Sequence, residues 1–278
     1  MTEPGKRSVH SLLQKKRNGE RIVCLTAYDC PLARIEQEAG IDLILVGDSI
    51  NMAVLGDETT LGATMDLMIA HTRAVRRGAP ETLVVGDMPF GSYQPSEALA
   101  IENAMRFLVE GGADAVKLEG GSGRALERVE AILDSGIPVM GHIGLLPQSL
   151  RKAGGYRVVG SSQRDRLMAE GRALADAGAF AVVVESVEEA LAREITDSIE
   201  VPTIGIGAGR YTDGQVLVVN DVLGMSGDFA PRFVRKYAEL GSLAAGAVNA
   251  YVRDVREGSF PAREHCYKPV DRKDAETK

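Results

Sequence analysis

The chain has 278 residues, a formal net charge of −7 and three cysteines. The negative charge argues against nucleic acid or an anionic membrane surface as the main partner, and Cys24, Cys30 and Cys266 form no CxxC pair, as is typical of a reducing compartment. There is no apolar segment of a signal peptide, and no apolar run approaches the ~18 residues of a membrane-spanning helix. We therefore expect a cytoplasmic protein.

Predicted strands and helices alternate along the chain. Helices are expected at residues 9–16, 31–40, 66–77, 95–111, 124–134 and 164–177. A further helix follows the strand at 181–185 and ends at about residue 198, and the last helices lie within residues 231–256. Strands are expected at residues 22–28, 43–47, 83–87, 115–119, 138–142, 181–185, 202–206 and 216–219. The segment between the last two strands is too short for a full helix. Eight strand–helix units predict an α/β fold, a (β/α)₈ TIM barrel with an N-terminal helix and C-terminal helices.

The domain organisation follows from the uninterrupted alternation. No Pro/Ser/Gly-rich linker or charge block divides the chain, so we expect a single barrel domain over residues 1–278. Only the charged tail after about residue 269 is expected to be disordered.

Six predicted strands each end at a titratable residue. These residues are Asp29, Asp48, Asp87, Glu119, His142 and Glu185. In a (β/α)₈ barrel the carboxyl ends of the strands surround the active site. The positions of these residues therefore indicate an enzyme.

Strand alternation in the segment AVKLEG places Lys117 and Glu119 on one face and Val116 and Leu118 on the other. The apolar pair should contact the surrounding helices, so Lys117 and Glu119 should point into the barrel. They could form a buried ion pair with each other. Alternatively, Lys117 binds a substrate carboxylate or forms a Schiff base.

Asp48 and Asp87 end neighbouring strands and both follow a glycine. Two adjacent acids repel each other unless a cation lies between them, and two carboxylates completed by water and substrate suit Mg²⁺. Glu119 could complete the metal site, directly or through water. Either aspartate alone could instead cap the following loop. Ser49 could donate a hydrogen bond to an anionic ligand.

His142 and Glu185 follow apolar strand residues. The position of His142 at a strand end favours substrate contact over the alternative of a core histidine. The four apolar residues before Glu185 should shield its carboxylate from water and raise its pKa, as a carboxylate base acting on a carbon acid requires. As an acid that starts a helix it would be unremarkable.

Two loops have the composition of binding segments. The glycine-rich segment 145–163 is long for a barrel loop, which is typical of a lid or a binding segment. The glycines of PTIGIGAG would suit a phosphate, although they could equally give a strand end room to approach a neighbour.

Nine segments in order resemble the ketopantoate hydroxymethyltransferase family, over residues 8–267. They are TAYD, LILVGDS, AHTRAVRRGAP, GDMPFGSY, VKLEGG, GHIGLLPQS, GGYRVVG, IGIGAG and TDGQVLV. Each motif is weak alone, but together they are specific. Asn51 stands where many members have glycine.

The resemblance implies a Mg²⁺-dependent transferase of pantothenate biosynthesis that assembles as a decamer, a pentamer of dimers. Its substrates would be 3-methyl-2-oxobutanoate and 5,10-methylenetetrahydrofolate. Asp48, Asp87 and Glu119 match metal positions, and Glu185 matches the base. Positions that hold the keto acid are matched by Asp48, Ser49, Asp87, Lys117 and His142.

Three other interpretations compete with this one. A Mg²⁺-dependent lyase or aldolase acting on another 2-oxo acid could use a similar barrel and acid cluster. A Schiff-base aldolase would use Lys117 without a metal. A barrel that only binds a keto acid is disfavoured, because loss of catalysis usually erodes such a cluster. No readable motif marks the folate pocket.

Overall fold

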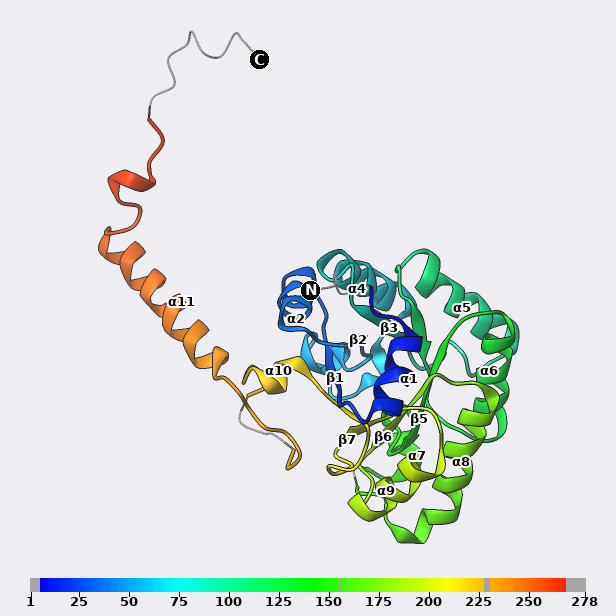
Figure 1. Ribbon diagram of the computed structural model, residues 1–278. Coiled ribbons are helices and arrows are strands. Elements are labelled where there is room, and N and C mark those ends of the chain that lie inside the picture. The colour runs from blue at the N-terminus through cyan, green and yellow to red at the C-terminus, as the bar shows by residue number, and fades with distance from the viewer. Residues whose placement is uncertain (1–5, 156, 228–230, 269–278) are drawn as a thin grey trace.

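The computed structural model describes residues 6–155, 157–227 and 231–268, and its centre is a closed barrel of eight parallel strands (Figure 1). The strands follow one another around the barrel in chain order. They are β1 (Ile22–Thr26), β2 (Leu43–Val46), β3 (Leu83–Asp87), β4 (Ala115–Lys117), β5 (Val139–Gly144), β6 (Ala181–Glu185), β7 (Thr203–Ile206) and β8 (Gly214–Leu217). The predicted (β/α)₈ barrel is confirmed.

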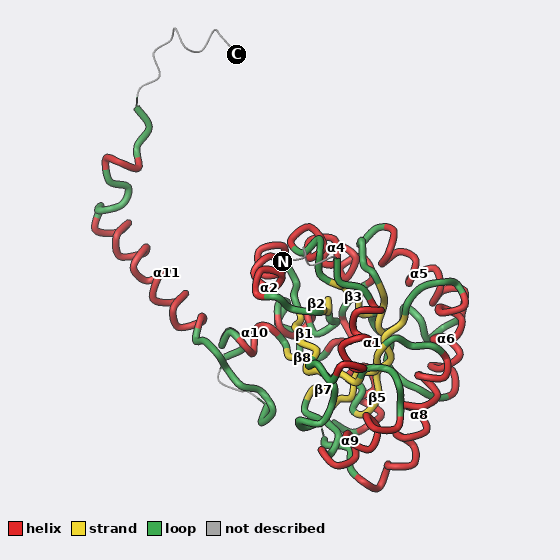
Figure 2. Tube along the Cα trace, viewed as in Figure 1, coloured by secondary structure: helices red, strands yellow, loops and turns green. Residues whose placement is uncertain are grey.

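Helices surround the barrel on the outside, as Figure 2 shows. The longer ones are α2 (Cys30–Ala39), α4 (Met65–Gly78), α5 (Glu97–Val109), α6 (Gly123–Asp134), α8 (Arg164–Ala177) and α9 (Glu189–Ser198). Two more long helices, α1 (Val9–Asn18) and α11 (Leu240–Glu257), precede and follow the barrel in the chain. Short ones are α3 (Ile50–Ala53), α7 (Leu150–Ala153) and α10 (Val219–Val222), with 3₁₀ turns at Thr60–Gly62, Pro147–Ser149, Ser161–Gln163 and Arg263–His265. No helix lies between β7 and β8, as the short connecting segment predicted.

Local sequence accounts for most helix boundaries. Thr64 and Ser96 accept hydrogen bonds from the first-turn amides of α4 and α5, and such caps satisfy N–H groups that the helix itself cannot. Gly40 and Gly178 end α2 and α8 in the left-handed conformation that glycine adopts most easily.

Two predicted elements near the C-terminus were wrong in position. The last strand is β8 at Gly214–Leu217 rather than residues 216–219, because Val219 begins α10 and its N–H bonds to the Thr26 hydroxyl. The predicted helices within residues 231–256 reduce to α11. Residues 231–239 are not helical, since the Tyr237 amide pairs with the carbonyl of Val222 instead of an intrahelical partner. The tail after 269 lies outside the described residues.

The core has two layers, which follow from strand alternation. Inward-pointing residues such as Cys24, Leu43, Met140 and Val183 fill the barrel, and the other face packs against the helices. Helix α1 closes the amino-terminal end of the barrel with Leu12, which is fully buried. With that end closed, ligands reach the strands from the carboxyl end.

Helix α11 leaves the barrel as an extended arm (Figure 1). It has 18 residues and none of them is buried. Across the described ranges of the chain, α11 included, no helix is both long and apolar enough to cross a membrane.

Candidate active site

A cavity of about 190 Å³ lies at the carboxyl ends of the strands. It is lined by all seven residues that the sequence singled out as site candidates: Asp48, Ser49, Asp87, Lys117, Glu119, His142 and Glu185. They arrive from β2 through β6 because parallel strands end at the same rim. The structure thus brings these candidates together.

Asp29, the remaining titratable strand-end residue, lies elsewhere. It is exposed and caps α2, where its carboxylate accepts a hydrogen bond from the Leu32 amide at 2.8 Å. Its position after an apolar strand therefore reflects a helix start and not chemistry.

Lys117 pairs with Asp87. Strands β3 and β4 pair with Asp87 opposite Lys117, and Lys117 Nζ lies 2.8 and 3.0 Å from the two Asp87 carboxylate oxygens. Burial lowers the pKa of Lys117, but the charges of Asp87, Glu119 and Asp48 outweigh burial and hold that pKa above its ordinary value. Lys117 is therefore a permanent cation inside the barrel, and its ion pair is with Asp87, not with Glu119.

Asp48 lies beside this pair. Its amide donates to an Asp87 carboxylate oxygen at 3.2 Å, and its own carboxylate accepts from the Gln148 side chain at 3.0 Å. Burial, together with the charge of Asp87, raises the pKa of Asp48 to about 7. An additional positive charge here would relieve that repulsion.

Gln148 and Tyr93 form a network that sequence reasoning missed. The Gln148 amide donates to Glu119 at 3.1 Å and its side chain donates to Asp48, while its side-chain oxygen accepts from the Tyr93 hydroxyl at 2.8 Å. Gln148 lies in the 3₁₀ turn Pro147–Ser149 of the long loop after β5. That loop was expected to bind ligand, but nothing in its sequence singled out one residue.

Glu119 is buried and only partly hydrogen-bonded. Burial first, and then the charges of Asp48, Asp87 and Glu185, raise its pKa well above the ordinary value, although Lys117 opposes the shift. Its Oε1 atom has no hydrogen-bond partner among the described residues. An unpaired buried carboxylate oxygen is costly unless a ligand satisfies it.

His142 and Glu185 lie next to each other. His142 Nε2 is 3.2 Å from Glu185 Oε2, but the approach has no hydrogen-bond geometry. Burial and the charge of Lys117 lower the pKa of His142 well below its ordinary value, so its ring is neutral. Burial and the charge of Asp87 raise the pKa of Glu185 to about 7.

The backbone around Glu185 is unusually constrained. Ser186 has φ of 51°, a left-handed conformation that costs energy for a residue with a side chain. Gly144 has φ of 102°, and a Cβ atom there would lie 2.2 Å from the Glu185 carbonyl oxygen. Only glycine lets β5 end this close to Glu185.

Most of the remaining cavity wall is apolar or hydroxylic, although the carboxylate residue Asp221 also lines it. Leu45, Val183 and Val216 from the barrel interior and Phe233 from the segment after β8 contribute to it. Ser49 shares a hydrogen bond of 2.9 Å with the hydroxyl of Tyr28. Asn51 does not line the cavity, and its side chain donates to the Thr59 carbonyl at 2.7 Å.

The acid set fits a hard divalent cation. Asp48 and Asp87 present mutually repelling carboxylates, and Glu119 has an unsatisfied oxygen nearby, which is the oxygen-rich set that Mg²⁺ prefers. Among the described residues, no three acidic, histidine or cysteine side chains already converge on one point as a metal site. Asp48, Asp87 and Glu119 are therefore the residues that could hold such a cation.

The fold and this site define the protein as an enzyme of the (β/α)₈ barrel class, with a buried acid–lysine–histidine cluster around a small cavity. Residues 6–263 match the family model of ketopantoate hydroxymethyltransferase. The chain therefore belongs to the ketopantoate hydroxymethyltransferase family.

Two relatives show how close this relationship is. The 3-methyl-2-oxobutanoate hydroxymethyltransferase of Thermotoga neapolitana is 54% identical, with 92% of this chain and 94% of the relative covered. The enzyme of the same name from Rhizobium etli is 52% identical over 95% and 96% of the two chains. The resemblance seen in the sequence is confirmed, and the chain is a hydroxymethyltransferase of pantothenate biosynthesis.

Solved structures with a similar fold are much more distant in sequence. A phosphonopyruvate hydrolase in complex with oxalate and Mg²⁺ is 13% identical, with a TM-score of 0.61 and 93% of each chain covered. A 2,3-dimethylmalate lyase is 19% identical, with a TM-score of 0.59 over 94% of this chain and 92% of the other. At these identities the likeness concerns the barrel fold.

Proposed function

We propose that the chain moves the one-carbon unit of 5,10-methylenetetrahydrofolate onto 3-methyl-2-oxobutanoate through an enolate. The third carbon of the keto acid loses its proton, which gives the enolate. The methylene bridge of the donor opens at one of its two nitrogens, which takes up a proton, and the enolate attacks the carbon of the iminium that remains on the other nitrogen. Water then replaces that second nitrogen on the carbon, which gives ketopantoate and tetrahydrofolate. The observation that carries this proposal is the single cavity in which Lys117 and the two aspartates face Glu185 and His142.

Glu185 is the base in this proposal. Its pKa of about 7 makes it a far better proton acceptor than an ordinary carboxylate, yet it is still ionised in a good fraction of molecules at neutral pH. His142, neutral and 3.2 Å away, can donate one ring N–H to the keto acid.

Lys117, Asp48, Asp87 and Ser49 hold the keto acid. The fixed positive charge of Lys117 is available to the carboxylate of the substrate, and the Ser49 hydroxyl can donate a hydrogen bond to it. We place the alkyl group of the substrate against the apolar wall formed by Leu45, Val183 and Val216. This orientation leaves the third carbon on the side of Glu185.

Mg²⁺ is the proposed cofactor, held by Asp48 and Asp87 with Glu119 through water. When bound, it would supply positive charge that stabilises the enolate. The repulsion between Asp48 and Asp87 and the unsatisfied oxygen of Glu119 support this assignment.

The Schiff-base alternative fits the site poorly. A nucleophilic lysine must lose its proton near neutral pH, which requires a lowered pKa. The ion pair with Asp87 has the opposite effect on Lys117. A lyase acting on another 2-oxo acid rests on fold likeness alone, whereas the match to the transferase family covers residues 6–263.

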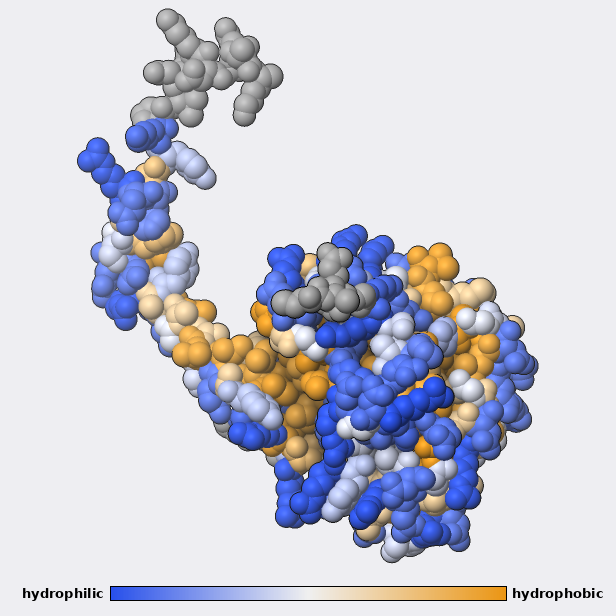
Figure 3. Space-filling model, in the orientation of Figure 1, coloured by the Kyte–Doolittle hydropathy of each residue, from blue (hydrophilic) through white to orange (hydrophobic). Residues whose placement is uncertain are grey.

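Self-association is the proposed state of the protein, with the decamer as the assembly that its family implies. Val248, Tyr251 and Val255 are exposed three and four residues apart along α11, Leu243 is exposed near its start, and the helix has no buried residue. Figure 3 shows apolar surface along this arm and on the adjoining flank of the barrel. An exposed apolar helix of this length is a typical interface element. The cytoplasmic location stays a prediction.

Exchange of the third-carbon proton of 3-methyl-2-oxobutanoate in D₂O, followed by NMR, tests the enolate step. Exchange that requires both enzyme and Mg²⁺ is the expected result. Exchange that survives removal of Mg²⁺ and is accompanied by trapping of Lys117 with borohydride would replace the proposal with the Schiff-base mechanism. No exchange under any condition would reject the enolate.

A further inference from the structure

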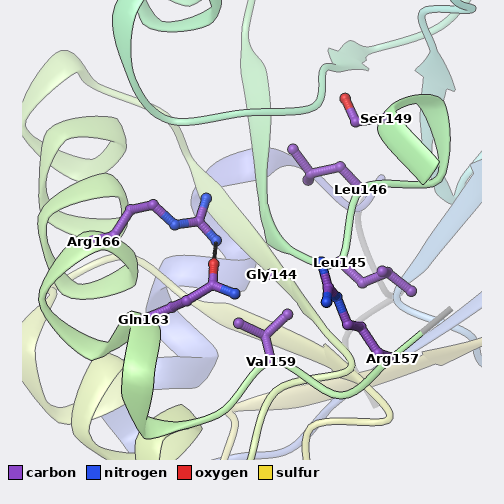
Figure 4. Close-up of a pocket in the computed structure, with 8 residues that line it drawn as sticks. All are labelled: Gly144, Leu145, Leu146, Ser149, Arg157, Val159, Gln163 and Arg166. Carbon is purple, nitrogen blue, oxygen red and sulfur yellow. Dashed lines mark hydrogen bonds between the residues drawn. The ribbon is translucent and has the colours of Figure 1, made fainter. Parts of the chain in front are cut away.

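A second cavity, of about 270 Å³, lies outside the acid cluster, between the end of β5 and the start of α8. Its walls combine apolar side chains from Leu145, Leu146 and Val159 with the guanidinium groups of Arg157 and Arg166. In the close-up of Figure 4, Arg166 and Gln163 lie on one side, Arg157 lies beside Leu145, and Val159 lies between them. None of the proposed catalytic roles uses this cavity.

The two arginines make this cavity suited to an anion. Arg166 contacts Gln163 and forms an ion pair of 3.2 Å with Glu170. These two contacts use only some of the five N–H donors of the Arg166 guanidinium. Carboxylates are preferred partners of guanidinium groups because both are planar and can pair through two hydrogen bonds. Glu170 is the carboxylate already paired with Arg166, so an incoming anion would use the remaining donors of this guanidinium.

The second cavity begins where the catalytic strands end. Leu145 directly follows β5, which carries His142, and its amide donates to the Glu185 carbonyl at 2.9 Å. Val159 pairs with Val187, two residues after Glu185. The second cavity therefore lies within a few residues of the strand ends that carry His142 and Glu185.

The proposed one-carbon donor has the matching shape and charge. It is a pteridine joined to an aromatic aminobenzoyl ring and to one or more glutamates, so it is far larger than the inner cavity of 190 Å³, which the keto acid already occupies in part. Its reactive methylene must approach Glu185, and its anionic tail must lie outside. Apolar walls suit the aromatic ring, and arginines suit the glutamate carboxylates.

We propose that the cavity between β5 and α8 binds the aminobenzoyl-glutamate tail of the donor, with Arg157 and Arg166 on its carboxylates. This inference rests on the proposed function, since it deepens the role of the folate substrate. It assigns a binding role to the long loop that the sequence marked as a lid or binding segment.

The test compares steady-state kinetics of Arg166→Ala, Arg157→Ala and the double variant with those of the unaltered enzyme. Methylenetetrahydrofolate with one and with three glutamates serves as the donor. Arg172→Ala is the matched control, because Arg172 is exposed on the same helix α8 but does not line the cavity. Thermal unfolding of each variant checks that it is folded.

Each single variant should raise KM for the donor roughly tenfold, and the double variant should raise it further, as loss of a charge-assisted hydrogen bond predicts. KM for the keto acid should change much less, and the preference for the triglutamate should shrink. The control should leave both KM values unchanged.

Unaltered donor KM in the folded double variant would overturn the inference while the proposed function stands. An equal rise in the control would also overturn it, because it would show a general charge effect. If the unaltered enzyme makes no product from either donor, the proposed function itself fails.

Discussion

Glu185→Gln removes the proposed base while keeping the shape of the side chain. Burial raises the pKa of Glu185 from its ordinary 4.5 to about 7, which corresponds to roughly 3 kcal/mol of extra proton affinity. Glutamine has no comparable basicity. General-base catalysis typically contributes 10²–10⁴-fold, so exchange of the third-carbon proton should slow by ~10²-fold or more.

The pH dependence gives a second readout. A base with its pKa raised to about 7 is protonated and inactive below that pH, so exchange by the unaltered enzyme should rise as pH increases through about 7 and then level off. The variant should lack this rise, and it should still bind the keto acid with similar affinity by calorimetry.

Glu189→Gln is the control for this experiment. Glu189 pairs with Arg210 at 2.7 Å on the surface and does not line the cavity, so its replacement should leave exchange unchanged. Exchange by Glu185→Gln at the unaltered rate, or with the same pH midpoint, would refute the assignment of Glu185 as the base. Equal loss of keto-acid binding would also refute it.

Four further predictions follow from individual contacts. Asp87→Ala should weaken Mg²⁺ and keto-acid binding together, measured by calorimetry; unchanged Mg²⁺ dependence would exclude Asp87 as a ligand. Gln148→Leu should raise KM for the keto acid several-fold, because Asp48 loses its side-chain donor and the Tyr93 hydroxyl loses its acceptor, while Glu119 keeps the backbone amide of residue 148; an unchanged KM would contradict this. The buried Glu36 carboxyl has no hydrogen-bond partner among the described residues, and burial raises its pKa from 4.5 to about 8. The folded state therefore holds its proton more tightly than the unfolded chain does, so the unfolding free energy is highest below about pH 4.5 and falls as pH rises through about 8. Glu36→Gln should therefore gain up to ~5 kcal/mol of unfolding free energy over the unaltered protein across that range in denaturant titrations, and a pH-independent difference would contradict it. Removal of residues 240–278 should shift the protein to smaller species in analytical ultracentrifugation, whereas an unchanged assembly would exclude α11 as an interface.

The sequence predicted the barrel well because local signals repeat along it. Strand β3 and helix α8 agree in both boundaries with the expectation, since apolar runs and glycine or capping residues mark their ends. Residues 231–239 escaped prediction because their backbone bonds to the region of α10, a tertiary choice that local periodicity does not record.

The composition of the site was predictable, but its pairing was not. Every residue proposed for the acid cluster lies at or just after a strand end, where barrel topology collects them. The partner of Lys117 depends on the register between β3 and β4, which aligns it with Asp87. Gln148 and Tyr93 were missed because a loop side chain can point in many directions until the fold fixes it.

Transfer of a ¹³C-labelled methylene group from methylenetetrahydrofolate to 3-methyl-2-oxobutanoate is the most direct test of the whole account. With Mg²⁺ present, NMR should show the label in the hydroxymethyl carbon of ketopantoate, at a rate that falls sharply in Glu185→Gln. Label that stays on the folate while the keto acid still exchanges its proton would contradict the assignment of the donor.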